Sequence, residues 1–161
     1  MKSLLRSGWR ISKRGYAEPP ASAFDGEGSR RRGGRWSPAG RRVAYASSSL
    51  ALASLEYFVH LDPVDAPPDL VSIRVEIPSD IHFETVETAT LHANWRHYPY
   101  ARDLQWIGER WLFAESSVCL RVPSAVIPEE FNILINPLHR DFKALQFLKP
   151  VEFTFDPRMW K

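Results

Sequence analysis

Apolar and polar residues alternate along several short stretches of this chain, and a period of two is the pattern of a strand with one buried face. The alternation is clearest from Leu70 to Ile77, where Ser72, Arg74 and Glu76 stand at the polar positions. Residues 118–122 alternate in the same way before a proline ends the pattern. Further short strands are predicted at residues 42–46, 132–135 and 151–155.

Two longer stretches have apolar residues at helical spacing. Serines 47–49 supply candidate N-caps for a helix that runs to about His60. Its apolar residues cover most of the circumference, so we expect this helix to lie largely buried, with Glu56 as its one carboxylate. A second helix is predicted in residues 100–114, with Leu104, Ile107, Gly108 and Trp111 on one side.

The order of these elements favours an α+β fold. The first 40 residues are rich in glycine and proline, which predicts long ordered loops around short strands. Strands and two helices then follow in irregular order, and half-buried alternation is typical of a mixed or antiparallel sheet. The length of 161 residues and the hydrophobic content of 44% fit a single domain spanning residues 1–161.

The number of cysteines and the length of the apolar stretches indicate where in the cell the protein is found. The single cysteine, Cys119, excludes an internal disulfide, and its place in an alternating strand indicates a small buried residue. The five histidines show no metal-ligand spacing, so no metal site is predicted. Residues 50–59 form the longest nearly apolar stretch, well below the roughly 20 residues needed to cross a bilayer. We therefore expect a cytoplasmic protein that does not span a membrane and carries no signal peptide.

Charge is unevenly distributed along the chain. The net charge is +2, but residues 1–42 hold eleven lysines and arginines against three acidic residues, whereas the remainder is acidic. This loop-rich basic part would suit an anionic ligand. A solvated basic surface explains the same asymmetry equally well.

Within the basic part, Gly33-Gly34-Arg35-Trp36 is a candidate binding loop. Two glycines permit a close backbone approach, a guanidinium can hold a diphosphate, and the indole of Trp36 can stack on a base. The alternative is a tight turn followed by an exposed arginine and a core tryptophan.

Three residues outside the loop can join it. A carboxylate on a buried helix, such as Glu56, requires a cation, hydrogen-bond donors or a water-lined cleft, and Arg35 is one plausible partner. The alternative role for Glu56 is a structural ion pair. Tyr45 ends the strand before this helix, where a core tyrosine is an equal alternative. Ser124 follows a strand end and can donate to a ligand or cap a turn.

Taken in order, several segments resemble the RES family, the toxin halves of bacterial RES–Xre toxin–antitoxin pairs. The resemblance covers nearly the whole chain and rests on Trp9-Arg10-Ile11, Gly33-Gly34-Arg35-Trp36, Val43-Ala44-Tyr45-Ala46, Ala51-Leu52-Ala53-Ser54-Leu55-Glu56, Leu120-Arg121-Val122-Pro123-Ser124, Asn132-Ile133-Leu134-Ile135-Asn136-Pro137-Leu138-His139 and Phe155-Asp156-Pro157-Arg158. One departure is Ser37, where the family often has asparagine, and it changes the expected hydrogen bonding of the loop.

The resemblance implies an ADP-ribosyltransferase-like fold and an enzyme that depletes NAD by phosphorolysis or hydrolysis of the nicotinamide–ribose bond. Some members are instead ADP-ribosyltransferases acting on a protein. The implied catalytic residues are Arg35, Tyr45, Glu56 and Ser124. The implied substrate-binding residues are Arg10, Gly34, Trp36 and Asn136.

The implied chemistry agrees with the residue types. Breaking the bond passes through an oxocarbenium-like state that Glu56 can stabilise, and Arg35 would hold the diphosphate or an attacking phosphate. Tyr45 and Ser124 would orient the nicotinamide ribose. NAD is thus the expected substrate and phosphate a possible co-substrate, with no permanently bound cofactor and no metal.

The family also implies a partner, an Xre-type helix-turn-helix antitoxin that blocks the active site in a hetero-oligomeric complex. A nucleic-acid-binding module using Arg30, Arg31 and Arg32 is the non-enzymatic alternative. We disfavour direct nucleic-acid binding, because a buried acid at the centre of a basic site serves no purpose there.

Overall fold

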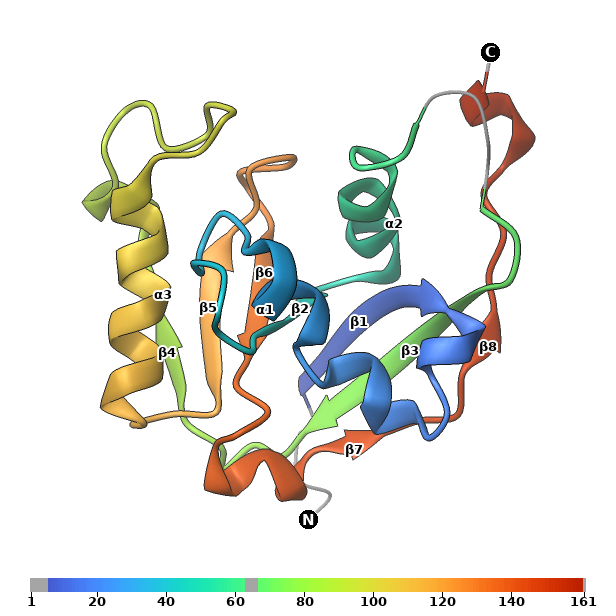
Figure 1. Cartoon of the computed structure of the whole chain (residues 1–161), viewed down its shortest axis with the longest axis horizontal. Helices are drawn as coiled ribbons and strands as arrows, with labels where there is room; N and C mark the ends of the chain where they lie inside the picture. Colours follow the sequence, from blue (N-terminus) through green and yellow to red (C-terminus); the bar gives the residue numbers. More distant parts are fainter. Residues whose placement is uncertain (1–5, 63–66, 161) are drawn as a thin grey trace.

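The structure, a computed structural model, describes residues 6–62 and 67–160. It is an α+β domain built on one eight-stranded sheet in the order β4-β5-β6-β2-β1-β3-β7, with β8 also pairing with β3. The strands β4 and β5 are parallel, and the other neighbouring pairs are antiparallel. The sheet turns along its width, with α3 packed on one half and α2 standing over the other (Figure 1). The expected α+β fold with a mixed sheet is confirmed.

The strands are β1 (Arg6–Lys13), β2 (Ala44–Ser47), β3 (Leu70–Ile77), β4 (Phe83–Thr85), β5 (Cys119–Pro123), β6 (Phe131–Ile135), β7 (Gln146–Phe147) and β8 (Val151–Glu152). The α-helices are α1 (Glu27–Arg32), α2 (Leu50–Phe58) and α3 (Arg102–Ala114). Short 3-10 segments are η1 (Arg14–Tyr16), η2 (Pro20–Phe24), η3 (Thr88–Thr90), η4 (Arg140–Ala144) and η5 (Pro157–Trp160). No helix in residues 6–62 and 67–160 is long and apolar enough to cross a membrane.

The strongly patterned elements lie where the sequence predicts them. The strand β3 has the predicted bounds, and β2, β5, β6 and α3 lie within two residues of theirs. The predicted strand at 151–155 is shorter, because β8 ends at Glu152. The expectation of short strands in the first 40 residues is wrong for β1, which pairs with β3 from Arg6 opposite Ile77 to Lys13 opposite Leu70.

The helix α2 is more open than its composition predicts. Ser49 is its N-cap and accepts a hydrogen bond from Leu52 N at 3.1 Å, which confirms the predicted start. However, Leu52 and Ala53 are its only fully buried residues, and Val59 just beyond it is 55% exposed. The expectation of a largely buried helix is therefore wrong, because one side of α2 packs on β1 and β2 and the other side is left open.

Three apolar clusters hold these layers together. The largest lies among β2, β3, β5, β6 and η2, and includes Phe24 and Cys119, the latter with no exposed surface as expected. A second cluster packs α3 onto the sheet through Trp36, Trp111 and Leu134. A third packs α2 beside β1 and β3. Trp36 thereby ties the glycine-rich loop to α3.

The contact between this loop and α3 requires a glycine in the helix. A Cβ built at Gly108 would overlap the carbonyl oxygen of Trp36, so the helix can lie this close to the loop only without a side chain there. Gly108 is buried inside α3, where alanine would otherwise be the better helix former.

Gly108→Ala should therefore destabilise the fold by about 1–3 kcal/mol, because the added methyl forces α3 away from Trp36. Gly28→Ala in α1 is the matched control, since nothing lies within 4 Å of its Cβ position. The control should be neutral or stabilise by up to about 1 kcal/mol. Urea unfolding measures both variants, and equal stabilities for the two would contradict this packing.

Candidate active site

A hydrogen-bonded carboxylate joins α2 to the loop between β5 and β6. The oxygen Glu56 Oε1 accepts from Ser124 Oγ at 2.7 Å and from Asn132 Nδ2 at 2.6 Å. Ser124 directly follows β5, and Asn132 is the second residue of β6. Two donors on one oxygen fix the orientation of the carboxylate and leave Oε2 without a hydrogen-bond partner among the described residues.

The hydroxyl of Ser124 is fully used within the protein. It donates its one proton to Glu56 and accepts from the backbone N–H groups of Val126 at 3.1 Å and Ile127 at 3.0 Å. A hydroxyl has one proton and two lone pairs, so no further bond remains for a ligand. Ser124 has no exposed surface. It therefore caps the turn and orients Glu56, and the structure does not place it against a ribose.

Asn132 is a site residue that our sequence analysis did not select. Its amide is held in turn by Ser47, whose Oγ donates to Asn132 Oδ1 at 2.7 Å. The two residues lie opposite each other in the β2–β6 register, so the pairing of these strands sets the geometry. An amide in an otherwise apolar strand is the signal that points to this position.

Asn136 lies at the other end of β6. Its Oδ1 accepts from Leu138 N at 3.0 Å, and its own N–H donates to Val118 O at 2.9 Å. With 5% of its surface exposed, Asn136 closes the turn after β6 and is separated from Glu56 by the length of the strand. The structure thus brings Asn132, and not Asn136, to the carboxylate.

Arg35 approaches the same region from the glycine-rich loop. Its Nη1 donates to the carbonyl oxygens of Trp95 at 2.7 Å and His97 at 3.0 Å, and its guanidinium lies 5.5 Å from the ring centre of Tyr100. Burial lowers the pKa of Arg35, and the charge of Glu56 acts in the opposite direction. A direct ion pair with Glu56, one of the alternatives that the sequence left open, does not occur among the described residues. The Nε and Nη2 edge of Arg35 has no hydrogen-bond partner among the described residues, so it can receive an anion.

Tyr45 is held by the residue that departs from the family pattern. Its hydroxyl hydrogen bonds to Ser37 Oγ at 2.8 Å, and Ser37 Oγ in turn contacts Ser29 Oγ at 2.9 Å. A Cβ at Gly34 would lie 2.7 Å from the Tyr45 hydroxyl, so only glycine permits this approach. Burial raises the pKa of Tyr45 to about 12, which keeps the phenol protonated near neutral pH.

Two further residues predicted to bind substrate, Trp36 and Arg10, contact other parts of the protein instead. Trp36 is 2% exposed and packs against Trp95 with ring centres 6.2 Å apart, so its indole belongs to the core and is not available to stack on a base. Arg10 donates from Nη1 to Tyr45 O at 2.9 Å, and burial lowers its pKa. Arg10 therefore supports the backbone of β2 at Tyr45.

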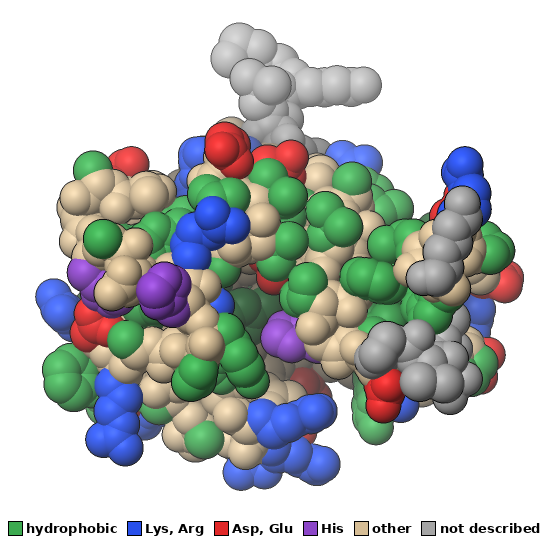
Figure 2. All heavy atoms as spheres, turned by 90° about the horizontal axis from the view of Figure 1, so that it is seen from above, with side chains coloured by type: hydrophobic (Ala, Val, Ile, Leu, Met, Phe, Trp, Pro, Cys, Tyr) green, Lys and Arg blue, Asp and Glu red, His purple; other side chains and the backbone are tan. Residues whose placement is uncertain are grey.

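Viewed onto the end that carries α2, the molecule is hollowed between its α2 side and its α3 side, with basic and histidine side chains at the rim (Figure 2). The arrangement combines a fixed carboxylate, a guanidinium with a free edge and a protonated phenol. In the described parts of the chain, no three His, Cys, Asp or Glu side chains are grouped as ligands for a metal ion.

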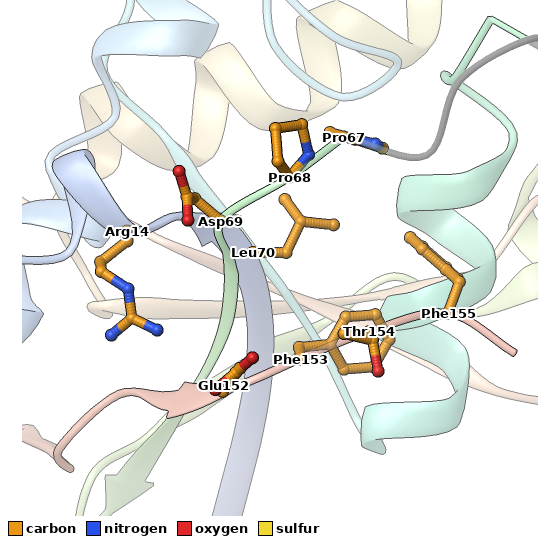
Figure 3. Close-up of a pocket in the computed structure, with 9 residues that line it drawn as sticks. All are labelled: Arg14, Pro67, Pro68, Asp69, Leu70, Glu152, Phe153, Thr154 and Phe155. Carbon is orange, nitrogen blue, oxygen red and sulfur yellow. The ribbon is translucent and has the colours of Figure 1, made fainter.

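A smaller pocket lies where β3 begins, beside β8 (Figure 3). Its volume is about 150 Å³, and its charged residues, Arg14, Asp69 and Glu152, have both signs. Small-molecule sites commonly enclose about 300 Å³ or more. This pocket is thus too small for a dinucleotide, and neither Glu56 nor its hydrogen-bond partners line it.

The raised pKa of Tyr45 has a measurable consequence at high pH. A tyrosine ordinarily titrates near 10, whereas the folded protein holds the Tyr45 pKa at about 12. Its stabilising contribution is complete below about 10 and is lost as the pH rises towards about 12. The free energy of unfolding should therefore fall more steeply over this range for the natural protein than for Tyr45→Phe. Parallel curves for the two proteins would contradict the burial of this hydroxyl.

Comparisons with known proteins identify relatives of this chain. The RES domain matches residues 7–156. The Prs ADP-ribosylating toxin of a Sphingobium species is 37% identical, with 97% of this chain and 98% of that protein covered. Toxin Res of Yersinia enterocolitica is 36% identical over 94% of this chain and 97% of its own length.

The fold is shared with a solved structure of low sequence identity. The crystal structure of the M. tuberculosis MbcT-MbcA toxin-antitoxin complex contains a chain that aligns with a TM-score of 0.73 and 17% identity, covering 98% of this chain and 88% of that one. The matched domain, the relatives and the common fold agree, and the chain belongs to the RES-domain toxin family.

Proposed function

We propose that this toxin cleaves the nicotinamide–ribose bond of NAD, with phosphate or water as the acceptor. The observation that carries the proposal is the carboxylate of Glu56. Two donors hold one of its oxygens, and the other oxygen has no hydrogen-bond partner in the described part of the chain. The name of the Sphingobium relative, an ADP-ribosylating toxin, supports the choice of bond, because ADP-ribosylation from NAD breaks the same bond.

The residues divide the chemistry among them. As nicotinamide leaves, the ribose acquires oxocarbenium character, and the free oxygen of Glu56 can stabilise it directly or through a ribose hydroxyl. The free edge of Arg35 is suited to a diphosphate or an attacking phosphate, because a guanidinium binds such groups through two parallel hydrogen bonds. The hydroxyls of Ser37 and Tyr45 share one hydrogen bond, and either can be its donor. When Ser37 donates, the phenol proton of Tyr45 can be donated to a ribose or phosphate oxygen.

Transfer of ADP-ribose to a protein is the second candidate, favoured by the name of the same relative. It uses the same bond cleavage and differs in the acceptor. Adenine-labelled NAD distinguishes the two in a lysate, because only protein transfer leaves the label on a protein.

We further propose a cytoplasmic setting and an Xre-type antitoxin partner that covers the cleft. The related structure is that of a toxin-antitoxin complex, which supports a protein partner of this kind. Expression of the chain alone should arrest bacterial growth, and co-expression of the antitoxin should restore it. Unimpaired growth with high levels of folded protein would contradict the toxin proposal.

Glu56→Gln should abolish nicotinamide release from NAD while retaining the fold, because it keeps the shape of the side chain and removes its charge. Glu129→Gln is the matched control, an exposed acid in the loop between β5 and β6, and should keep full activity. Chromatography of the products with and without phosphate identifies the acceptor. Intact NAD after incubation with folded natural protein would refute the proposed reaction.

Asn132→Ala should lower kcat by about 10- to 100-fold and leave KM nearly unchanged. A hydrogen bond to a charged group is worth about 1.5–3 kcal/mol, and this one orients Glu56 without contacting NAD. Asn136→Ala should reduce stability and leave kcat within about twofold, because its side chain closes a turn away from the carboxylate.

Steady-state kinetics on folded protein decide between the two asparagines. If Asn136→Ala lowers kcat and Asn132→Ala does not, the assignment of Asn132 is wrong.

Ser124→Thr should retain more activity than Ser124→Ala, because threonine keeps the hydroxyl group that donates a hydrogen bond to Glu56.

A further inference from the structure

A second hollow lies on the face of the sheet opposite Glu56. It has a volume of about 370 Å³ and is lined mainly by Arg6, Phe83, Thr85, Arg121, Phe131 and Ile133. Side chains alternate between the two faces of a strand, so Phe131 and Ile133 point away from the face of Asn132. The register agrees, because Arg121 pairs with Ile133 whereas Val122 pairs with Asn132.

The charges in this hollow have one sign. Arg6 and Arg121 are its ionisable residues, and none of the described acidic side chains lines it. Arg121 lies over the ring of Phe131 at 3.7 Å from its centre and has no ion pair or side-chain hydrogen bond among the described residues. Arg6 lies over Phe83 at 3.9 Å in the same manner.

Arg6 is only partly satisfied. Its Nη2 donates to the carbonyl oxygens of Pro78 and Ile81, which anchors the guanidinium at the edge of the hollow. Its Nε is buried and has no partner among the described residues. The Nη1 group has no hydrogen-bond partner among the described residues and is the part of this guanidinium that can meet an anion.

Three arginines in or near α1 are compensated by a carboxylate, unlike the two in the hollow. Arg30, Arg31 and Arg42 all form ion pairs with Glu27, and their charges are thereby compensated on the surface. In the hollow, each guanidinium has a phenylalanine beneath it and no carboxylate beside it. The ring fixes the plane of each cation. The N–H edges of Arg121 and the Nη1 group of Arg6 have no partner among the described residues, and N–H groups in this arrangement can receive an anion edge-on.

We propose that this hollow binds a small organic phosphate, whose phosphate group is held by Arg6 and Arg121. A phosphate group with two negative charges matches the two cations. The volume of the hollow is that of a small-molecule site and exceeds what an inorganic ion requires. The site shares β6 with Asn132, but it uses none of the residues assigned to NAD cleavage.

Titration of isotopically labelled protein with AMP, followed by amide chemical shifts, tests the site. We expect shifts at Phe83, Thr85, Arg121, Phe131 and Ile133. Arg121→Gln should weaken AMP binding at this site by about tenfold or more, because it removes one of the two cations. Arg110→Gln, which removes an exposed charge on α3, should leave binding unchanged.

Arg35→Gln separates the two sites. Shifts around the hollow that persist in this variant support a site distinct from the cleft. Shifts confined to residues around Glu56, unchanged affinity in Arg121→Gln, or no binding of AMP at millimolar concentration would overturn the proposal. A parallel titration with inorganic phosphate tests whether the organic part of the ligand contributes to binding. Equal affinity for AMP and inorganic phosphate would show that the hollow binds free phosphate and would overturn the proposal of an organic phosphate.

Discussion

The carboxylate of Glu56 and its two donors constrain the rest of the site. Glu56, Ser124 and Asn132 are far apart in the sequence and come from α2, the end of β5 and the start of β6. The two donors converge on one oxygen only if β2, β6 and β5 keep their register, because Ser47 on β2 holds the amide of Asn132. A one-residue slip of β6 would turn Asn132 to the opposite face.

The partners of Glu56 also explain what Arg35 is free to do. A half-buried carboxylate can be stabilised by a cation or by neutral donors, and this protein uses neutral donors. The guanidinium of Arg35 is anchored separately by the carbonyl oxygens of Trp95 and His97. A negative and a positive group therefore lie near each other without forming a direct ion pair among the described residues. Such a site can bind a ligand that carries both an anionic diphosphate and a ribose that becomes cationic.

The basic character of the first 42 residues has more than one structural origin. Arg30, Arg31 and Arg42 surround Glu27, and hydrogen bonds from Arg30 and Arg31 lower the pKa of that partly exposed carboxyl to about 2. These arginines match the solvated surface that we considered as an alternative. Arg35 lies close enough to Glu56 to be affected by its charge and Arg10 supports β2, so only part of the charge asymmetry bears on the proposed site.

The sequence by itself determined the fold class, the bounds of β3, a start of α2 within Ser47-Ser48-Ser49 and the group of Arg35, Tyr45 and Glu56, because these depend on local periodicity, capping and a recurring motif order. Only the tertiary structure decided that Ser124 and Asn132 orient Glu56, that Asn136 closes a distant turn and that Trp36 is a core residue. The reason is physical: strand register selects which polar side chain on β6 reaches the carboxylate, and the close approach of α3 at Gly108 buries the loop that carries Trp36.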